Sequence, residues 1–252
     1  MNKLFIVGCG IKFLSHMTLE VQSVIQKSDC VIYLVNDPAM KQWIIDNSVK
    51  AISLDLIYFN FTDRSHAYNA ISQEVINITK ENRNTCFIIY GHPFFLTTSS
   101  EQLIRTIEKN SLDIQVEILP GISSLDCLLC DLRIDPGFGG IQAYESTEFI
   151  NKDYKINSDS HLVLWQIGVI GINTIINDEK ALQCRAERIY ALQKIKEKLL
   201  TWYEEDHSII LYTASMYPSI SFEKVHVPIS QLDVAVIHRL STAYIPPKLE
   251  TK

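Results

Sequence analysis

The sequence predicts an α/β fold with two domains, and three features carry this prediction. Short apolar segments alternate with amphipathic ones over the first 118 residues, and the predicted strands among them are nearly all apolar. This pattern indicates a parallel sheet covered by helices on both faces. After Ile134-Asp135-Pro136-Gly137 the strand candidates become widely separated and one long helix interrupts them. We therefore expect an N-terminal α/β domain over 1–118 and a C-terminal α+β domain over 119–252.

The first domain is expected to begin with a buried strand over Leu4–Val7. Further strands are expected over Cys30–Val35, Thr85–Tyr90 and Gln115–Ile118. The helices between them are expected over Thr18–Lys27, Met40–Asp46, Ala67–Glu81 and Ser100–Lys109. Their apolar residues recur at helical spacing, which is typical of helices packed against a sheet.

The second domain is expected to open with an apolar helix that ends at Leu132. Ser123-x-x-Asp126 resembles a capping box at the start of this helix. Its strands are expected over Ile141–Tyr144, His161–Gln166, Ile209–Tyr212 and Val234–His238, and its long helix over Glu179–Glu204. An apolar stripe on the long helix leaves two interpretations open, burial in its own domain or contact with a second subunit. The stripe consists of Tyr190, Leu192, Ile195, Leu199, Leu200 and Trp202.

Composition and charge narrow the classes of function. Of the 252 residues, 47% are hydrophobic and 21% are charged, as in ordinary soluble globular proteins. The formal net charge is −6 and Lys and Arg form no block, which argues against a nucleic-acid partner. No apolar run reaches the length of a membrane span, and the one at the N-terminus is too short for a signal peptide.

Six cysteines are scattered along the chain at positions 9, 30, 86, 127, 130 and 184. They lack the density of a disulfide scaffold, and we interpret them as small core thiols in a reducing cytoplasm. Cys127 and Cys130 have the spacing of a redox or metal pair, but they lie in an apolar helical run with no second pair. We therefore predict no metal site.

Two predicted strands end in turns rich in Gly and Pro. Phe87–Tyr90 runs into Gly91-His92-Pro93, and the next strand runs into Leu119-Pro120-Gly121. In open α/β sheets, ligands bind at the carboxyl ends of the strands, so these turns are expected to form two walls of one pocket. Gly8-Cys9-Gly10 follows the first strand and indicates a third tight turn, although it is not a complete dinucleotide fingerprint.

The motifs Gly8-x-Gly10, Tyr90-Gly91-His92-Pro93, Leu119-Pro120-Gly121-Ile122-Ser123 and Ser241-Thr242 before Pro246-Pro247 occur in this order along nearly the whole chain. In this arrangement the chain resembles the tetrapyrrole-methylase-like S-adenosylmethionine methyltransferases. The resemblance implies two α/β domains with the cofactor cleft between them. It also implies S-adenosylmethionine as cofactor and S-adenosylhomocysteine as product.

Further segments point to one branch of that superfamily: Tyr58 through Arg64 to Tyr68, Asp131–Pro136, Tyr144–Thr147 and Leu164-Trp165-Gln166. They resemble the borosin peptide-backbone N-methyltransferases of the omphalotin type. Fused members of that family carry their substrate as a C-terminal extension, and this chain stops at Lys252 without one. The resemblance thus implies a discrete, split-type enzyme that acts on a separate precursor peptide, and it implies a homodimer.

The resemblance also assigns cofactor contacts in both halves of the chain. The assigned residues are Gly8, Gly10, Tyr90, His92, Phe95, Ser123, Ser124, Gln166, Ala214, Ser241 and Thr242. Some have structural alternatives, because Ser123 and Ser124 are suited to capping a helix and His92 to a hydrogen bond that stabilises a turn. At a helix start, a capping role and a ligand role can coexist.

Tyr58, Arg64 and Tyr68 are the predicted catalytic residues. A peptide nitrogen is a poor nucleophile because its lone pair is delocalised into the carbonyl group. Methylation therefore requires removal of the amide proton or stabilisation of an imidate-like oxygen. If Arg64 and Tyr68 fall on one helical turn, their spacing of four residues puts both side chains on one face. The Arg64 guanidinium is then expected to favour the phenolate of Tyr68, so that Tyr68 takes the proton. Tyr58 is expected to donate to the oxygen, and no metal is needed. The alternative is that Arg64 is a solvated surface charge and the tyrosines are half-buried packing residues.

The leading interpretation is S-adenosylmethionine-dependent N-methylation of backbone amides in a ribosomally made precursor peptide. An alternative within the same fold is a methyltransferase for a tetrapyrrole or another small molecule. A third interpretation is a catalytically silent protein that binds the precursor peptide. It is favoured by Phe94, which stands where the family usually has Gly and is expected to narrow the cofactor pocket or reshape the peptide channel.

Overall fold

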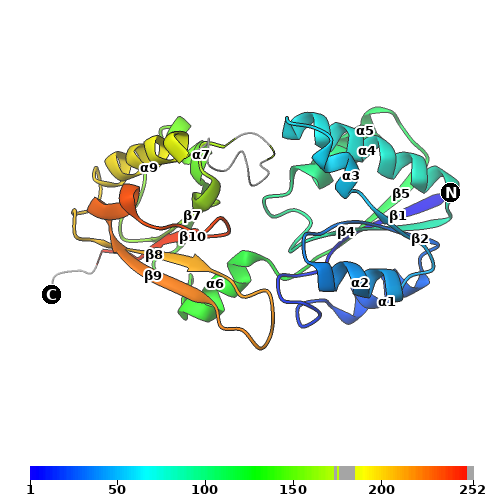
Figure 1. The fold of residues 1–252 in the computed structure, drawn as a ribbon, viewed down its shortest axis with the longest axis horizontal. Coiled ribbons are helices and arrows are strands. Elements are labelled where there is room, and N and C mark those ends of the chain that lie inside the picture. The colour runs from blue at the N-terminus through cyan, green and yellow to red at the C-terminus, as the bar shows by residue number, and fades with distance from the viewer. Residues whose placement is uncertain (173–174, 176–184, 249–252) are drawn as a thin grey trace. The chain divides into compact units, whose positions relative to one another are not determined.

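The computed structural model describes residues 1–172, 175 and 185–248 and confirms the α/β class. It contains two five-stranded sheets with helices packed against them (Figure 1). The chain forms two compact units. The first consists of Met1–Cys127 and the short segment Met216–Ile220, and the second consists of Leu128–Ser215 and Ser221–Lys252.

The first sheet is parallel throughout, as the apolar strands predict. Its order is β3-β2-β4-β1-β5. The strands are β1 (Asn2–Gly8), β2 (Cys30–Leu34), β3 (Ala51–Ser53), β4 (Asn84–Ile89) and β5 (Ile114–Leu119). The sequence does not predict β3, because three residues carry too little of the period-2 pattern to be recognised. Strand β1 is central, and it pairs with β4 on one side and β5 on the other.

Helices cover both faces of the first sheet (Figure 1). They are α1 (Leu19–Lys27), α2 (Pro38–Asp46), α3 (Asp55–Phe59), α4 (Arg64–Glu81) and α5 (Thr98–Lys109). Alternate residues along a strand serve the two faces, as the pleat requires. Ile6 and Phe87 pack in the hydrophobic cluster that includes α4 and α5, whereas Val7 and Ile88 pack in the cluster that includes α1 and α2.

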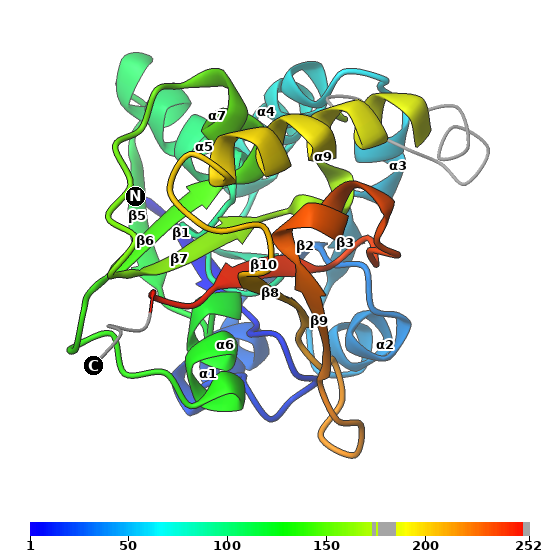
Figure 2. The same cartoon turned by 90° about the vertical axis from the view of Figure 1, so that its left-hand side faces the viewer.

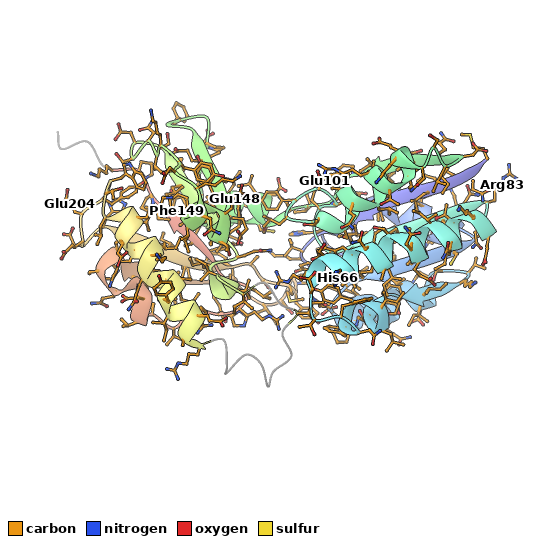
Figure 3. All side chains as sticks on the ribbon, turned by 90° about the horizontal axis from the view of Figure 1, so that it is seen from above. His66, Arg83, Glu101, Glu148, Phe149 and Glu204 are labelled. Carbon is orange, nitrogen blue, oxygen red and sulfur yellow. The ribbon has the colours of Figure 1, made fainter. Side chains whose placement is uncertain are left out.

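Helix α4 begins at Arg64, one turn earlier than predicted, because Asp63 caps it. The Asp63 carboxylate accepts hydrogen bonds from the backbone N–H groups of Ser65 at 2.8 Å and His66 at 3.1 Å. From the end near His66, α4 runs along the length of the first unit (Figure 3). This earlier start places Arg64 in the same helix as Tyr68, which meets the condition that their catalytic pairing requires.

The second sheet is mixed and has the order β6-β7-β10-β8-β9 (Figure 2). Its strands are β6 (Ile141–Glu145), β7 (His161–Trp165), β8 (Ser208–Thr213), β9 (Glu223–Pro228) and β10 (Thr242–Ile245). β6 is parallel to β7, and the other pairs are antiparallel. Helices α7 (Ser146–Asn151) and α9 (Arg185–Leu199) pack against it around one buried cluster that includes Phe149, Leu164 and Ile195.

The predicted strand over Val234–His238 is wrong. Residues Ile229–Val234 form a short 3₁₀ helix, and the chain then continues without regular structure to β10. The Val-Ala-Val-Ile run imitates a strand, but the side chains of Val234 and Val236 are 76% and 95% exposed and only Ile237 is buried. The strands of this region are instead β9 and β10.

The long helix is shorter than predicted at its carboxyl end. α9 ends at Leu199 and not at Glu204, and the Tyr203 N–H returns to the Leu199 carbonyl at 3.0 Å. The predicted start, Glu179–Cys184, lies outside the described residues. Most of the apolar stripe is used within its own unit, since Leu192, Ile195 and Leu199 are buried in the core cluster. No helix in the described ranges is long and apolar enough to cross a membrane.

Replacing Asp63 with Ala removes the carboxylate that accepts from the first-turn N–H groups of α4. We expect the Asp63→Ala substitution to lower the free energy of unfolding by about 1 kcal/mol, measured by urea denaturation. Asp63→Asn is the matched control, because Asn caps helices as well as Asp does and is expected to keep near wild-type stability. Equal losses in the two variants would contradict the assignment of this cap.

Candidate active site

The three neighbouring strands β4, β1 and β5 of the first sheet end at the same edge, and a glycine lies at or just after each end. A Cβ atom on Gly8 would lie 2.3 Å from the carbonyl oxygen of Gly91, and one on Gly121 would lie 2.2 Å from the same oxygen. No side chain fits at that distance from backbone. The loops that leave these strands are therefore packed backbone against backbone, and we call this contact the glycine junction (Gly8, Gly91 and Gly121).

A second backbone contact strengthens the glycine junction. The Gly10 N–H donates to the Gly91 carbonyl at 3.1 Å, and the Gly91 N–H donates to the Gly10 carbonyl at 3.0 Å. Both residues have a positive φ, +75° for Gly10 and +74° for Gly91, a conformation that glycine adopts without strain. The tight turn predicted after the first strand is therefore confirmed.

Tyr90 ties the β4 end to the loop after β1. Its hydroxyl donates a hydrogen bond to the Ile11 carbonyl at 3.2 Å. Burial is the main cause that raises the pKa of Tyr90 far above its ordinary value, so the phenol stays neutral in the folded chain. The Tyr90 hydroxyl thus has a hydrogen-bond partner within the protein. The predicted contact of Tyr90 with the cofactor would therefore be made by its ring or its backbone.

His92 stabilises the turn after β4, the structural role that the sequence leaves open for it. Its Nδ1 accepts from the Phe94 N–H at 3.1 Å, and its carbonyl accepts from the Phe95 N–H at 3.2 Å. An imidazole that accepts at Nδ1 carries its hydrogen on Nε2, which is then the nitrogen that can donate to a ligand. The side chain of Phe94 is 45% exposed.

The predicted capping box after β5 is confirmed. The Ser123 hydroxyl accepts from the Asp126 N–H at 3.3 Å, while the Asp126 carboxylate accepts from the Ser123 N–H at 2.7 Å. This reciprocal pair starts α6 (Ser124–Leu132) directly beyond the glycine junction. Seven of the predicted cofactor residues thus lie at the carboxyl ends of three adjacent strands or just beyond them: Gly8, Gly10, Tyr90, His92, Phe95, Ser123 and Ser124.

The second unit brings its four predicted cofactor residues to one edge of its own sheet. Gln166 directly follows β7, Ala214 directly follows β8, and Ser241-Thr242 begins β10, which lies between these two strands. The hydroxyls of Thr213 and Ser241 lie 3.1 Å apart, within hydrogen-bonding distance. Gln166 adopts a left-handed backbone conformation with φ +60°. The sequence gives the type of this residue but does not predict this conformation.

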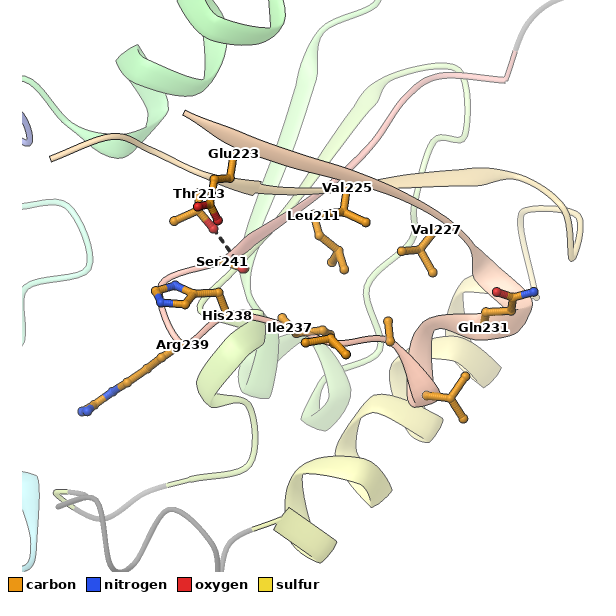
Figure 4. Close-up of a pocket in the computed structure, with 13 residues that line it drawn as sticks. Leu211, Thr213, Glu223, Val225, Val227, Gln231, Ile237, His238, Arg239 and Ser241 are labelled. Atoms are coloured by element: carbon orange, nitrogen blue, oxygen red, sulfur yellow. Dashed lines mark hydrogen bonds between the residues drawn. The ribbon is translucent and has the colours of Figure 1, made fainter. Parts of the chain in front are cut away.

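A cavity of about 680 Å³ adjoins this edge (Figure 4). Apolar side chains line most of it, among them Leu211, Val225 and Ile237, and the Thr213–Ser241 pair lies in its wall. A Cβ on Gly168 would lie 2.1 Å from the His238 carbonyl oxygen, so the loop after β7 packs directly on the chain that leads to Ser241.

The three predicted catalytic residues lie together in the first unit. Tyr58 lies on α3, and Arg64 and Tyr68 lie on α4. The rings of Tyr58 and Tyr68 have centroids 6.1 Å apart with planes 33° apart. The Arg64 Nε atom is buried and has no hydrogen-bond partner among the described residues. A buried hydrogen-bond donor without an acceptor costs free energy, and more so on a charged group. The Arg64 Nε–H is therefore a candidate to donate a hydrogen bond to a ligand.

The electrostatics of Tyr68 differ from the sequence-based expectation. Burial is the largest cause and raises the pKa of Tyr68 to about 12, and the proximity of Tyr58 also raises it. Arg64 lowers the pKa of Tyr68, as expected, but its effect is smaller than that of burial. Tyr68 is therefore a neutral phenol near pH 7 in the free protein.

The predicted cofactor residues fit a nucleoside with a sulfonium group. They supply hydroxyls, an amide, backbone groups and aromatic rings, and they include neither Lys nor Arg. A polyphosphate cofactor calls for such cations, whereas a cationic sulfonium does not. Within the described ranges, no group of three or more His, Cys, Asp or Glu side chains is placed to hold a metal ion.

The sequence does not reveal the contacts that Gly91, Gly121 and Thr213 make. The first two appear in the sequence as strand-end breaks, but their backbone contacts with Gly8 join positions more than 80 and 110 residues apart. Thr213 sits next to the predicted Ala214, and only the pairing of β8 with β10 brings it to Ser241. For Thr213, the signal available in the sequence was a polar residue at the end of a predicted strand.

A family model described as "Tetrapyrrole (Corrin/Porphyrin) Methylases" matches residues 3–216. Among curated proteins, a methyltransferase/ribosomally synthesized type I borosin cyclic peptide precursor from Coprinopsis marcescibilis is 30% identical over 251 residues. The omphalotin A precursor of Omphalotus olearius, also named a methyltransferase, is 29% identical over 255 residues. Each match covers 98% of this chain but 62% and 58% of the respective relative, so the chain spans about three fifths of their length.

Solved structures share the fold. Uroporphyrin-III C-methyltransferase from Thermus thermophilus superposes with a TM-score of 0.68 at 14% identity and covers 98% of this chain and 94% of its own. The same enzyme complexed with S-adenosylhomocysteine gives a TM-score of 0.63 at 12% identity, over 97% and 92% of the two chains. Cobalt precorrin-4 methyltransferase gives 0.64 at 13% identity, over 97% and 94%. At these identities the likeness shows the fold alone.

Replacing Gly121 with Ala places a Cβ against the Gly91 carbonyl and the Gly8 backbone. We expect Gly121→Ala to lower the free energy of unfolding by about 1–3 kcal/mol, because backbone gives way less easily than a side chain. Urea denaturation measures this. Gly137→Ala is the control, since its Cβ would meet only the side chain of Asp135. A Gly121→Ala protein as stable as this control would contradict the close packing described for the junction.

Proposed function

Because the chain belongs to the tetrapyrrole methylase family, we propose that it transfers the methyl group of S-adenosylmethionine to backbone amide nitrogens of a ribosomally made peptide. The observation that carries the peptide substrate is the cluster of Tyr58, Arg64 and Tyr68, in which a buried Arg64 donor lacks a partner. The borosin precursors among the relatives, named as methyltransferases fused to cyclic peptide precursors, support the same substrate class.

In each unit, the residues at the strand ends are proposed to contribute contacts to the cofactor. Gly8 and Gly10 bring backbone close to the nucleoside, and His92 offers its Nε2 hydrogen. Ser123 lies at the start of α6, and Ser241 and Thr242 supply hydroxyls at the edge of the second sheet. When bound, the cofactor supplies a methyl group on a cationic sulfur, which leaves as a neutral thioether.

The Tyr-Arg cluster is proposed to activate the amide. Arg64 donates from its unpaired Nε to the peptide carbonyl oxygen, which stabilises the imidate-like charge that develops there. Tyr58 donates a second hydrogen bond to the same oxygen. Tyr68 takes the amide proton, so that the nitrogen lone pair forms the new bond to carbon. With its pKa near 12, the Tyr68 phenolate is scarce at neutral pH but is a stronger base than an ordinary tyrosinate.

A tetrapyrrole or another small molecule is the second candidate substrate. The description of the matching family model favours it. It leaves the Tyr58, Arg64 and Tyr68 cluster without a function, since C-methylation of a ring does not require deprotonation of a peptide amide. We therefore rank it below the peptide.

The deciding experiment incubates the purified chain with S-adenosylmethionine and a peptide encoded beside its gene, supplied as a separate molecule. Mass spectrometry is expected to show successive gains of one methyl group, and fragmentation is expected to place them on backbone nitrogens. Calorimetry with S-adenosylhomocysteine separately establishes cofactor binding. Methylation of uroporphyrinogen in place of the peptide would support the second candidate, and binding of peptide without transfer would support a silent binding protein.

Tyr68→Phe and Arg64→Ala test the catalytic roles. We expect each variant to lower kcat for the peptide by about 10²–10⁴-fold, the usual contribution of a positioned acid or base. The affinity for S-adenosylhomocysteine is expected to stay near that of the wild type. The control is Tyr190→Phe, because Tyr190 lies on α9 in the other unit and is 61% exposed. Rates in Tyr68→Phe and Arg64→Ala as high as in this control would rule out the assigned roles.

The raised pKa of Tyr68 predicts how the rate depends on pH. Below a pKa of about 12, the fraction of Tyr68 present as phenolate rises tenfold per pH unit. Because the deprotonated form is the base, kcat at saturating substrates is expected to rise from about pH 7 to about pH 9. In Tyr68→Phe the residual rate is expected to stay flat over this range. Initial rates in a series of buffers measure both, and a flat wild-type profile would contradict Tyr68 as base.

A further inference from the structure

A five-residue segment from the second half of the sequence belongs to the first unit. Residues Met216–Ile220 follow β8 of the second sheet, but they pack with Met1–Cys127. We call this segment the strap. Neither Met216 nor Tyr217 belongs to the three buried hydrophobic clusters.

The strap contacts the loop Ile11–Met17, which follows β1. The Phe13 N–H donates to the Met216 carbonyl at 2.8 Å. The rings of Phe13 and Tyr217 have centroids 6.3 Å apart with planes inclined by 57°. The two segments are therefore joined through both backbone and side chains.

The Tyr217 hydroxyl donates to the Asp37 carboxylate. This carboxylate is 6% exposed, and its other oxygen accepts from the Met40 N–H at 2.7 Å, which caps α2. Asp37 follows β2, the strand next to β4, so it lies at the same sheet edge as the glycine junction. A hydrogen bond to a buried carboxylate is among the stronger ones in proteins, and the cap holds the acceptor in place.

The loop Ile11–Met17 has no regular helix or strand, so its shape depends on such ties. Tyr90 holds the Ile11 carbonyl, and the strap holds the Phe13 N–H. At the far end the His16 ring accepts from the Lys12 N–H at 3.2 Å. The base of the loop is Gly10, which also pairs with Gly91 and lies in the proposed cofactor site.

We propose that Tyr217 is a positioning residue for cofactor binding, which it serves by anchoring the strap on Asp37 and thereby fixing the loop Ile11–Met17. The inference rests on the proposed function for the identity of the cofactor. Because Tyr217 is outside the core clusters, its hydroxyl contributes to the shape of the loop more than to global stability. It touches neither substrate nor reacting atoms in this role.

The test compares Tyr217→Phe with the wild-type chain. The variant keeps the ring that packs on Phe13 and loses only the hydroxyl. By calorimetry, its affinity for S-adenosylhomocysteine is expected to be about tenfold weaker, which converts to ~1.4 kcal/mol. The KM for S-adenosylmethionine is expected to rise by a similar factor, while kcat at saturating cofactor stays within about twofold of the wild type.

Hydrogen exchange without any ligand gives a second readout. In Tyr217→Phe, amides of residues 11–17 are expected to exchange faster than in the wild type, while those of β1 and β4 are expected to keep their protection. The matched control is Tyr244→Phe, which removes a hydroxyl that bonds His161 at 2.7 Å in the second unit. His161 begins β7, so this bond lies away from the strand end at Gln166. The control is expected to change neither loop exchange nor cofactor affinity.

The outcomes separate this inference from the proposed function. Wild-type affinity in Tyr217→Phe, or unchanged exchange of its loop, would overturn the positioning role. Equal weakening in Tyr217→Phe and Tyr244→Phe would also overturn it, because the effect would then not be specific to the strap. A wild-type chain that binds S-adenosylhomocysteine but methylates no peptide refutes the peptide substrate and leaves the positioning role standing. A wild-type chain that does not bind S-adenosylhomocysteine refutes both.

Discussion

The glycine junction is the constraint from which the geometry of the first unit's strand ends follows. Gly8, Gly91 and Gly121 belong to three different loops, and their backbones are closer than any side chain would permit. The loops therefore leave the sheet from a common point, and Tyr90, His92 and Ser123 each lie within two residues of a junction glycine. Because the strands are locked in register by their hydrogen bonds, a shift in any one of them would break the junction. The positions of the candidate cofactor residues thus depend on the backbone atoms of three glycines, which have no side chains of their own.

Much of the fold is readable from the sequence, and the failures have physical reasons. The strands β1, β2 and β4 are buried on both faces, so their continuous apolar runs identify them. β9 is not predicted because its first four residues are exposed. β10 is not predicted because four residues are too few to show a pattern. Val234–His238 misleads because two residues of its apolar run, Val234 and Val236, are exposed to solvent and do not pack in a core. Local pattern predicts an element well only where burial produces the pattern.

The candidate site is predictable in its parts but not in its energetics. The sequence places Arg64 and Tyr68 four residues apart, and a helix there brings them to one face. It does not reveal how deeply Tyr68 is buried, and burial decides the direction of its pKa. The strap is likewise invisible in sequence, because Asp37 and Tyr217 are joined only by the fold.

The central place of β1 in its sheet has a consequence for how the chain is made. β1 leaves the ribosome before both of its partners, which are β4, at residues 84–89, and β5, at residues 114–119. During synthesis this apolar strand stays unpaired on both edges until those segments emerge, while β2 can pair with β3 much earlier. Such a segment is the kind of exposed strand that favours aggregation. Expression of the chain is thus expected to respond to slower elongation and to chaperones that shield β1.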